Sequence, residues 1–214
     1  MQRPEKIKKP EGKLAVLLPG LGAVSTTLIA GVLLARKGLA SPVGSLTQTG
    51  TIRLGKRTDN RIPRIKDFAP MAALDDIVFG SWDLFPDNAL ESALHAEVLD
   101  SKHVDPIKDE LAAIKPMTAA FYPEYVKRLH GTHVKTGATK ADIVEQLRAD
   151  IRGFIKSSGA DRAVCVWCGS TEIFLEQTEV HQSIKSFEKG LLENDPNIPN
   201  SMLYAWACLK EGVP

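Results

Sequence analysis

The 214-residue sequence has few cysteines, no excess of charge of either sign and one long apolar stretch. Three cysteines in a chain of this length do not make a disulfide framework. The 27 basic and 26 acidic side chains leave a net charge of +1, which gives no electrostatic footprint for nucleic acid or for an anionic membrane. We therefore expect a soluble cytoplasmic protein whose partners include neither nucleic acid nor a membrane.

The apolar stretch from Leu14 to Ala35 is uncharged and has about the ~20 residues that a membrane span needs. Pro19-Gly20, Gly22 and Gly31 divide it, so that a strand, a turn and a helix explain it better than one span. The same break leaves too short an apolar core for a signal peptide. The sequence also lacks the G-x-S-x-G and G-x-x-x-x-G-K-[ST] patterns of hydrolases and P-loop nucleotidases.

Short apolar runs alternate with amphipathic segments along the chain, which favours an α/β fold with a mainly parallel sheet flanked by helices. Strands are predicted at 13–19, 76–82, 118–121 and 162–168. Helices are predicted at 25–38, 88–99, 106–114, 140–158, 180–192 and 201–210. We expect residues 44–49 and 51–55 to be extended and residues 57–70 and 127–140 to be loops. Residues 1–12 should be a solvated tail, and residues 13–214 should form one domain.

The segment Gly20-Leu21-Gly22-Ala23-Val24-Ser25 is a candidate phosphate-binding turn, because a strand precedes it and a helix follows. The first glycine permits the turn and the second lets the backbone approach a pyrophosphate. Ser25 replaces the third glycine, and its hydroxyl or that of Thr26 or Thr27 can donate to phosphate. The alternative interpretation of this turn is a tight strand–helix connection without a ligand.

A dinucleotide also needs a carboxylate for its ribose, usually ~20 residues beyond the glycines. Residues 42–49 contain no acid, so another carboxylate must serve. Asp83 follows the predicted strand at 76–82, and ligands of open α/β sheets bind outside the carboxyl ends of strands. The alternative for Asp83 is an ordinary acid in a surface loop.

Six motifs in order resemble those of the inositol-phosphate synthases. They are G-L-G at 20–22, G-S-L-T-Q at 44–48, G-S-W-D at 80–83, F-Y-P at 121–123, W-C-G-S-T-E at 167–172 and E-G-V-P at 211–214. The resemblance implies a Rossmann-like NAD-binding domain and the conversion of D-glucose 6-phosphate to myo-inositol 1-phosphate by oxidation, aldol cyclisation and reduction. It also implies a homo-oligomer, as in the family's tetramers, and a divalent metal or ammonium ion in the complete enzyme.

The resemblance carries cofactor roles onto thirteen residues. The pyrophosphate would lie at the turn formed by Gly20, Leu21, Gly22, Ala23, Val24 and Ser25. Asp83 would bind the adenosine ribose, and Ala119 and Ala120 would lie beside the adenine. The nicotinamide side would be lined by Cys168, Gly169, Ser170 and Thr171. The family's catalytic lysines lie beyond the segment matching Pro214, so its C-terminal substrate domain is expected to be missing here and the segment to be inactive alone.

Two features depart from the family or stay open. Ala23, Val24 and Ser25 replace a Gly-Asn-Asn run, and the side-chain amide contacts of that run are absent. The alternative to the enzyme is a stand-alone dinucleotide-binding or regulatory module that keeps the fold without the family's lysines.

Two other pairs of residues have spacings that metal or redox sites use. Cys165 and Cys168 have C-x-x-C spacing, but on a strand they would point to opposite faces, which favours structural cysteines. His130 and His133 lie in a predicted loop without cysteines or paired carboxylates, which favours exposed histidines and no metal site.

Overall fold

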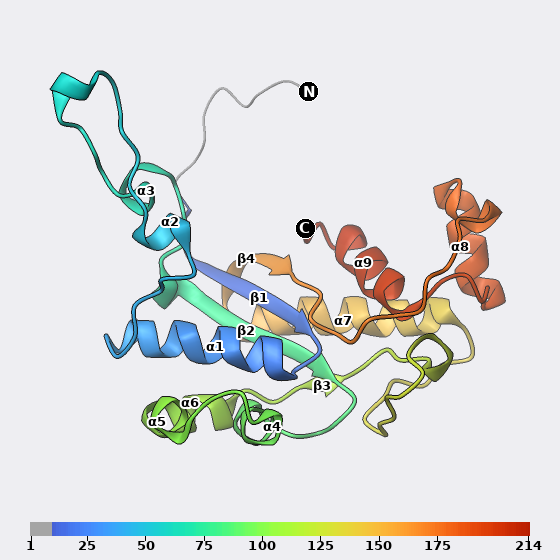
Figure 1. Cartoon of the computed structure of the whole chain (residues 1–214). Coiled ribbons are helices and arrows are strands. Elements are labelled where there is room, and N and C mark those ends of the chain that lie inside the picture. Colours follow the sequence, from blue (N-terminus) through green and yellow to red (C-terminus); the bar gives the residue numbers. More distant parts are fainter. Residues whose placement is uncertain (1–9) are drawn as a thin grey trace.

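The computed structural model describes residues 10–214, and these form an α/β domain around a parallel sheet (Figure 1). Within this range the sheet has four strands in the order β3-β2-β1-β4, all parallel. They are β1 (Lys13–Pro19), β2 (Ile77–Asp83), β3 (Met117–Thr118) and β4 (Ala160–Cys165). The predicted α/β class with a parallel sheet is confirmed.

The apolar run of β1 explains why this strand lies at the centre of the sheet. Ala15, Val16, Leu17 and Leu18 are all buried, because both faces of the strand are covered. Val16 and Leu18 pack on the same side as α1 (Ala23–Arg36), whereas Leu17 belongs to the opposite core with α7 (Lys140–Ser158). Alternate side chains of one strand thus serve two separate cores.

The helices divide between the two faces of the sheet (Figure 1). On the α1 side lie α4 (Ala89–Ala96), α5 (Ser101–Val104) and α6 (Lys108–Ala113). On the other side α7 packs against β4, α9 (Asn200–Lys210) and α8 (Ile184–Glu193). Single 3-10 turns occupy Asp105–Ile107, Pro123–Tyr125 and Glu179–His181.

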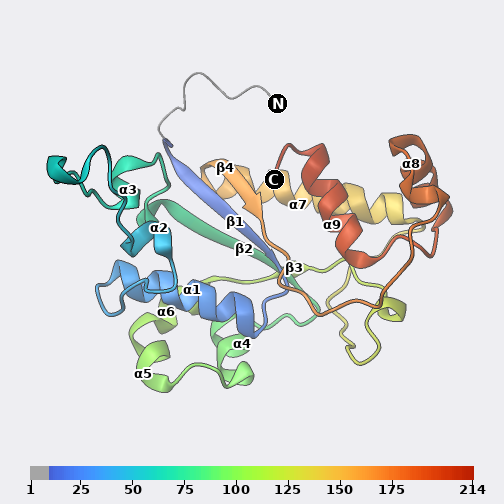
Figure 2. The ribbon, with the colours of Figure 1, turned by 45° about the horizontal axis from the view of Figure 1, so that its top comes forward.

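An insertion of residues 37–76 separates α1 from β2 and projects from the amino-terminal end of the sheet, as Figures 1 and 2 both show. It contains α2 (Leu46–Thr49), α3 (Ile65–Phe68) and the 3-10 turns Arg57–Asp59 and Leu74–Asp76. Its outer part is an antiparallel ribbon in which Ile52 N donates to Pro63 O at 3.0 Å and Leu54 N donates to Arg61 O at 2.9 Å.

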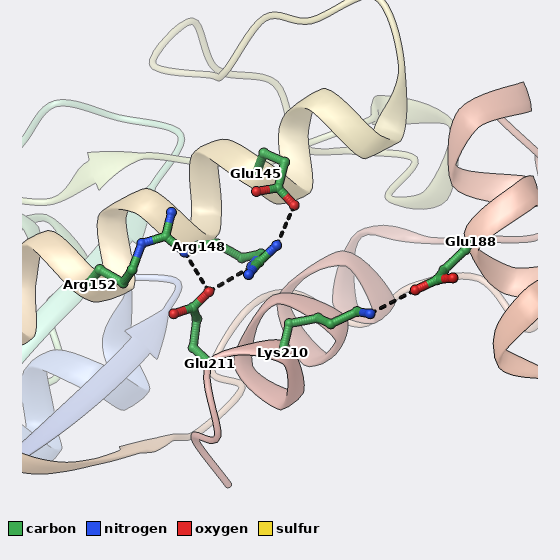
Figure 3. A network of polar contacts seen from close by, with 6 residues as sticks. All are labelled: Glu145, Arg148, Arg152, Glu188, Lys210 and Glu211. Carbon is green, nitrogen blue, oxygen red and sulfur yellow. Dashed lines mark hydrogen bonds and ion pairs between the residues drawn. The ribbon is translucent and has the colours of Figure 1, made fainter.

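A polar network fastens α9 to its neighbours (Figure 3). Glu211 Oε1, at the end of α9, accepts from Arg148 Nε and from Arg152 Nη1, each at 2.6 Å. Two arginines of α7 thus bind one carboxylate oxygen. Lys210 Nζ reaches Glu188 Oε1 of α8 at 2.7 Å. The backbone after α9 then returns to the sheet, where Cys165 N donates to Pro214 O at 2.8 Å.

The predicted elements exist with shifted ends, and several predictions of local structure are wrong. Residues 44–49 are not extended, since α2 forms there. The fourth strand ends at Cys165 and not at residue 168, although Val166 N still donates to Leu17 O at 2.9 Å and Cys168 N to Pro19 O at 3.0 Å. Short helical turns lie within the predicted loop at 57–70. The helix predicted at 180–192 is divided into the 3-10 turn Glu179–His181 and α8. Of the predicted tail, residues 1–9 lie outside the described residues.

Candidate functional site

A cavity of about 380 Å³ opens at the carboxyl ends of the strands. It lies where β1 has β2 on one side and β4 on the other, the position at which open α/β sheets bind ligands. Ten of the thirteen predicted residues line it: Gly20, Leu21, Gly22, Ala23, Asp83, Ala119, Ala120, Cys168, Gly169 and Ser170. Val24, Ser25 and Thr171 are not part of this lining.

The turn after β1 is built on Gly20, whose φ of +94° is a left-handed conformation that favours glycine. A Cβ on Gly20 would lie 2.9 Å from Cys168 O and from Gly169 N, so the backbones of two loops meet at this point. Gly22 is different, because a Cβ built there meets no described atom within 4 Å. Gly20 therefore permits the fold, whereas Gly22 leaves open space beside the cavity.

The hydroxyls that follow the turn are used within the protein. Ser25 is fully buried and its Oγ donates to Gly20 O, while Thr26 Oγ1 donates to Gly22 O at 3.0 Å. Both hydroxyls therefore already have backbone acceptors in the folded turn, and a contact of either with phosphate stays a prediction. The first closed bond of α1 runs from Thr26 N to Gly22 O, so the backbone amides of Ala23 and Val24 precede it and can serve an anion.

Asp83 is the last residue of β2, and its carboxylate joins two loops of the site. Its Oδ2 accepts from Leu21 N at 2.5 Å and its Oδ1 accepts from Phe85 N at 3.1 Å. The side chain is only partly buried and lines the cavity, and its carboxylate also holds the glycine turn. His133 lies directly behind it, with Nδ1 3.0 Å from Asp83 O, and is partly buried, whereas His130 is exposed as predicted.

The wall of the cavity beside Ala119 and Ala120 is fixed by polar side chains from α9. Ala120 N donates to Tyr204 Oη at 2.8 Å, and Tyr122 N donates to Asn200 Oδ1 at 2.7 Å. Burial raises the pKa of Tyr204 well above its usual range, so its phenol stays protonated. Tyr204 and Asn200 both line the cavity. The sequence did not predict them, because nothing in the helical pattern of α9 indicates which face meets the loop at Ala119 to Tyr122.

The segment after β4 closes the cavity from the other side. Cys168 N donates to Pro19 O at 3.0 Å, which places the cysteine directly over the end of β1. Cys165 lies instead within β4 and, with Cys208 of α9, lines a second, apolar pocket. The two cysteines of the C-x-x-C spacing thus occupy separate sites and are partly buried. In residues 10–214 no three His, Cys, Asp or Glu side chains are placed to hold a metal ion.

Two lysines with buried ammonium groups also escaped prediction. Lys140 is 2% exposed, and its Nζ donates to Tyr125 Oη, Asp195 O and Ile198 O, each at 2.7 Å. Burial lowers the pKa of Lys140. The Lys135 Nζ lies 2.6 Å from Asp150 Oδ2, the oxygen that also accepts from the indole of the fully buried Trp82 at 2.8 Å. Both cations are neutralised or hydrogen-bonded inside the fold.

The parallel sheet, the left-handed glycine after its first strand and the acid that ends the neighbouring strand define a dinucleotide-binding domain of the Rossmann type. Residues 14–214 match the model of the NAD-binding domain of the family described as myo-inositol-1-phosphate synthase. The chain belongs to this family, and NAD is its cofactor, as the sequence predicted.

Individual relatives agree with this assignment. The chain is 48% identical over 212 residues to inositol-3-phosphate synthase 1 of Bacteroides thetaiotaomicron, covering 98% of this chain and 49% of the relative. It is 32% identical to inositol-3-phosphate synthase 1 of Oryza sativa subsp. japonica, covering 94% and 43%. A crystal structure of inositol-3-phosphate synthase from Caenorhabditis elegans has the same fold, with a TM-score of 0.87 at 22% identity over 94% of this chain and 43% of that chain.

The chain spans about half the length of the curated relatives that it matches. The structural match likewise covers less than half of the crystallised relative, 43% of that chain. Separately, none of the helices in residues 10–214 is long and apolar enough to cross a membrane.

Proposed function

We propose that this chain supplies the NAD-binding part of an enzyme that converts D-glucose 6-phosphate to myo-inositol 1-phosphate. The observation that carries the proposal is the cavity where Gly20, Asp83 and Cys168 converge, in a chain 48% identical to a protein named inositol-3-phosphate synthase 1. Bound NAD would accept a hydride from the sugar and return it after aldol cyclisation, so that no net redox change occurs.

Within that enzyme the residues of this chain would bind and orient the dinucleotide. The amides of Ala23 and Val24, at the positive end of α1, would face the pyrophosphate beside the open space at Gly22. Asp83 would accept from the adenosine ribose, Ala119 and Ala120 would lie along the adenine, and Cys168 to Ser170 would lie beside the nicotinamide. A carboxylate at the ribose favours NAD over NADP, because it repels a 2′-phosphate.

We further propose that this segment alone does not complete the reaction. Aldol closure needs cations that hold the phosphate and stabilise the enolate in a site sheltered from water. Lys135 and Lys140 cannot take this role, because their ammonium groups already serve Asp150 and three oxygens around Tyr125. The required cations would come from the part of the relatives that this chain does not match. A homo-oligomer, a cytoplasmic location and a divalent metal or ammonium ion belong to the same proposal.

The binding test is titration calorimetry with NAD and with NADP. Asp83→Ala should weaken NAD binding by about 1–3 kcal/mol, the cost of a lost hydrogen bond to a polar ligand group. Asp87→Ala is the matched control, since Asp87 lines the same cavity and forms no hydrogen bond with the glycine turn within residues 10–214. Tighter binding of NADP than of NAD by the unchanged chain would overturn the role of Asp83.

The activity test compares residues 1–214 with a longer polypeptide that adds the second half of the Bacteroides relative. Inositol phosphate formed from glucose 6-phosphate by the longer form alone supports the proposal. Formation by the 214-residue chain would refute the argument about the missing cations. NAD binding without activity in either form would favour a stand-alone dinucleotide-binding or regulatory module.

A further inference from the structure

The projecting ribbon of residues 50–67, here called the basic arm, carries a local concentration of positive charge. It has six basic and two acidic side chains, a net charge of +4, while the rest of the sequence has a net charge of −3. All six basic side chains are exposed, and none forms an ion pair with another residue in 10–214. They are Arg53, Lys56, Arg57, Arg61, Arg64 and Lys66.

The basic arm also presents apolar side chains to solvent. Ile52 is 38% exposed and Ile62 is 57% exposed, on the two strands of a ribbon that no third strand covers. An isolated two-stranded ribbon is at best marginally stable in water and normally packs against another element. A partner surface that combines acidic and apolar side chains would complete it.

Such a surface lies at the opposite end of the molecule, in residues 172–195, here called the acidic end. It has six acidic and two basic side chains, a net charge of −4. Glu176 and Glu179 are exposed and have no ion pair within residues 10–214. The exposed apolar residues Phe174, Ile184 and Leu192 lie among these charges. Its charge and composition are therefore complementary to those of the basic arm.

We propose that the basic arm packs against the acidic end of a second copy of this chain. The arm cannot reach its own acidic end, because Figures 1 and 2 both place the arm and α8 on opposite sides of the sheet. Two copies arranged about a twofold axis can each receive the arm of the other, which gives a closed pair with two equal contacts. The inference names a contact surface for the homo-oligomer proposed above and does not depend on the reaction.

The test is sedimentation velocity on the 214-residue chain with matched charge reversals. One variant carries Arg53→Glu and Arg61→Glu, and a second carries Glu176→Lys and Glu179→Lys. The control carries Lys108→Glu and Lys115→Glu, two exposed lysines on the α1 side that have no ion pair within the described range. Arm and control variants change the net charge equally, so that a general charge effect is separated from a local one.

We expect either of the first two variants to weaken self-association about tenfold or more, since each turns several attractive charge pairs into repulsive ones. Combining both reversals should restore the dissociation constant to within about threefold, and the control should leave it unchanged. Association of the unchanged chain should also weaken at about 0.5 M salt, where the Debye length falls to about 4 Å. NAD binding should be the same in all variants.

Three results would overturn the proposal: a chain that stays monomeric at low salt, an arm reversal without effect, or a combined variant as weak as either reversal alone. Binding of the arm to anionic vesicles or RNA without self-association would also overturn it. If a double reversal lowers the melting temperature, the single substitutions Arg61→Glu and Glu176→Lys replace the two double variants, first separately and then combined. A failure of this test leaves NAD binding and the proposed reaction untouched.

Discussion

The two glycines of the turn after β1 should respond in opposite ways to substitution. Gly20→Ala places a Cβ 2.9 Å from backbone atoms of Cys168 and Gly169 and holds a left-handed φ of +94°. The left-handed backbone costs about 1–2 kcal/mol, and the close contacts with a second loop add about as much. We expect a loss of about 2–4 kcal/mol in the free energy of unfolding, or about 5–15 °C in Tm for a chain of this size.

Gly22→Val should leave the fold nearly unchanged, because no described atom lies within 4 Å of a Cβ at Gly22 and its φ of −83° suits any residue. Its stability should stay within about 1 kcal/mol of the unchanged chain, the cost of replacing glycine at a helix N-cap. The added side chain would instead fill the space proposed for the pyrophosphate, and NAD binding should be lost.

Thermal melts followed by circular dichroism and titration calorimetry with NAD measure the two effects on the same samples. We expect Gly22→Val to keep its Tm but not to bind NAD, and Gly20→Ala to have a lower Tm. Normal NAD binding by Gly22→Val would show that residues 20–25 form only a packing turn. An unchanged Tm for Gly20→Ala would refute the close approach of the two loops.

Three further predictions concern the scaffold. The pKa of Tyr125 is raised by burial to about 12, so Tyr125→Phe should remove about 2–3 kcal/mol of the stability that unfolding titrations lose from pH 10 to 12, while buried Tyr204 contributes a separate part of that loss. The sign follows because the folded chain keeps the phenol proton that the unfolded chain releases near pH 10. Glu211→Gln should cost about 1–2 kcal/mol in urea unfolding, whereas Glu188→Gln, at a more exposed pair, should cost less than about 0.5 kcal/mol (Figure 3). Tyr204→Phe leaves Ala120 N without its acceptor and should lower stability by about 1–2 kcal/mol and weaken NAD binding, and unchanged melts would contradict it.

The order of the elements could be predicted because it rests on strong local patterns. The continuous apolar run of β1 indicates a strand covered on both faces, and the spacing of Ile143, Leu147 and Ile151 indicates one face of a long helix. α7 also begins with a capping box at Thr139 and Asp142 and ends at Gly159 with φ +66°. These signals lie within a few residues of the features that they specify.

Features that depend on distant contacts could not be predicted. The hydroxyl of Ser25 has two possible acceptors from sequence alone, a ligand or Gly20 O, and only the folded turn decides between them. The burial of Lys140 depends on Tyr125, Asp195 and Ile198, which two other segments of the chain bring to the start of α7. A lysine at the start of a helix has no local signal that distinguishes it from an exposed one.

Asp83, the acid proposed for the ribose, lies much farther from the glycines in the sequence than usual, yet the sheet topology behind the usual spacing is present. The ribose acid usually lies ~20 residues beyond the glycines, because a short connection normally leads from the first helix to the second strand. Here the insertion of residues 37–76 lengthens that connection, yet β2 still pairs with β1 in parallel, with Pro19 opposite Trp82. Asp83 consequently ends the strand beside the glycine turn, close enough for its Oδ2 to accept from Leu21 N at 2.5 Å. The register of β1 and β2 places Asp83 beside the glycine turn. The insertion of residues 37–76 lengthens the spacing in the sequence but does not change that register.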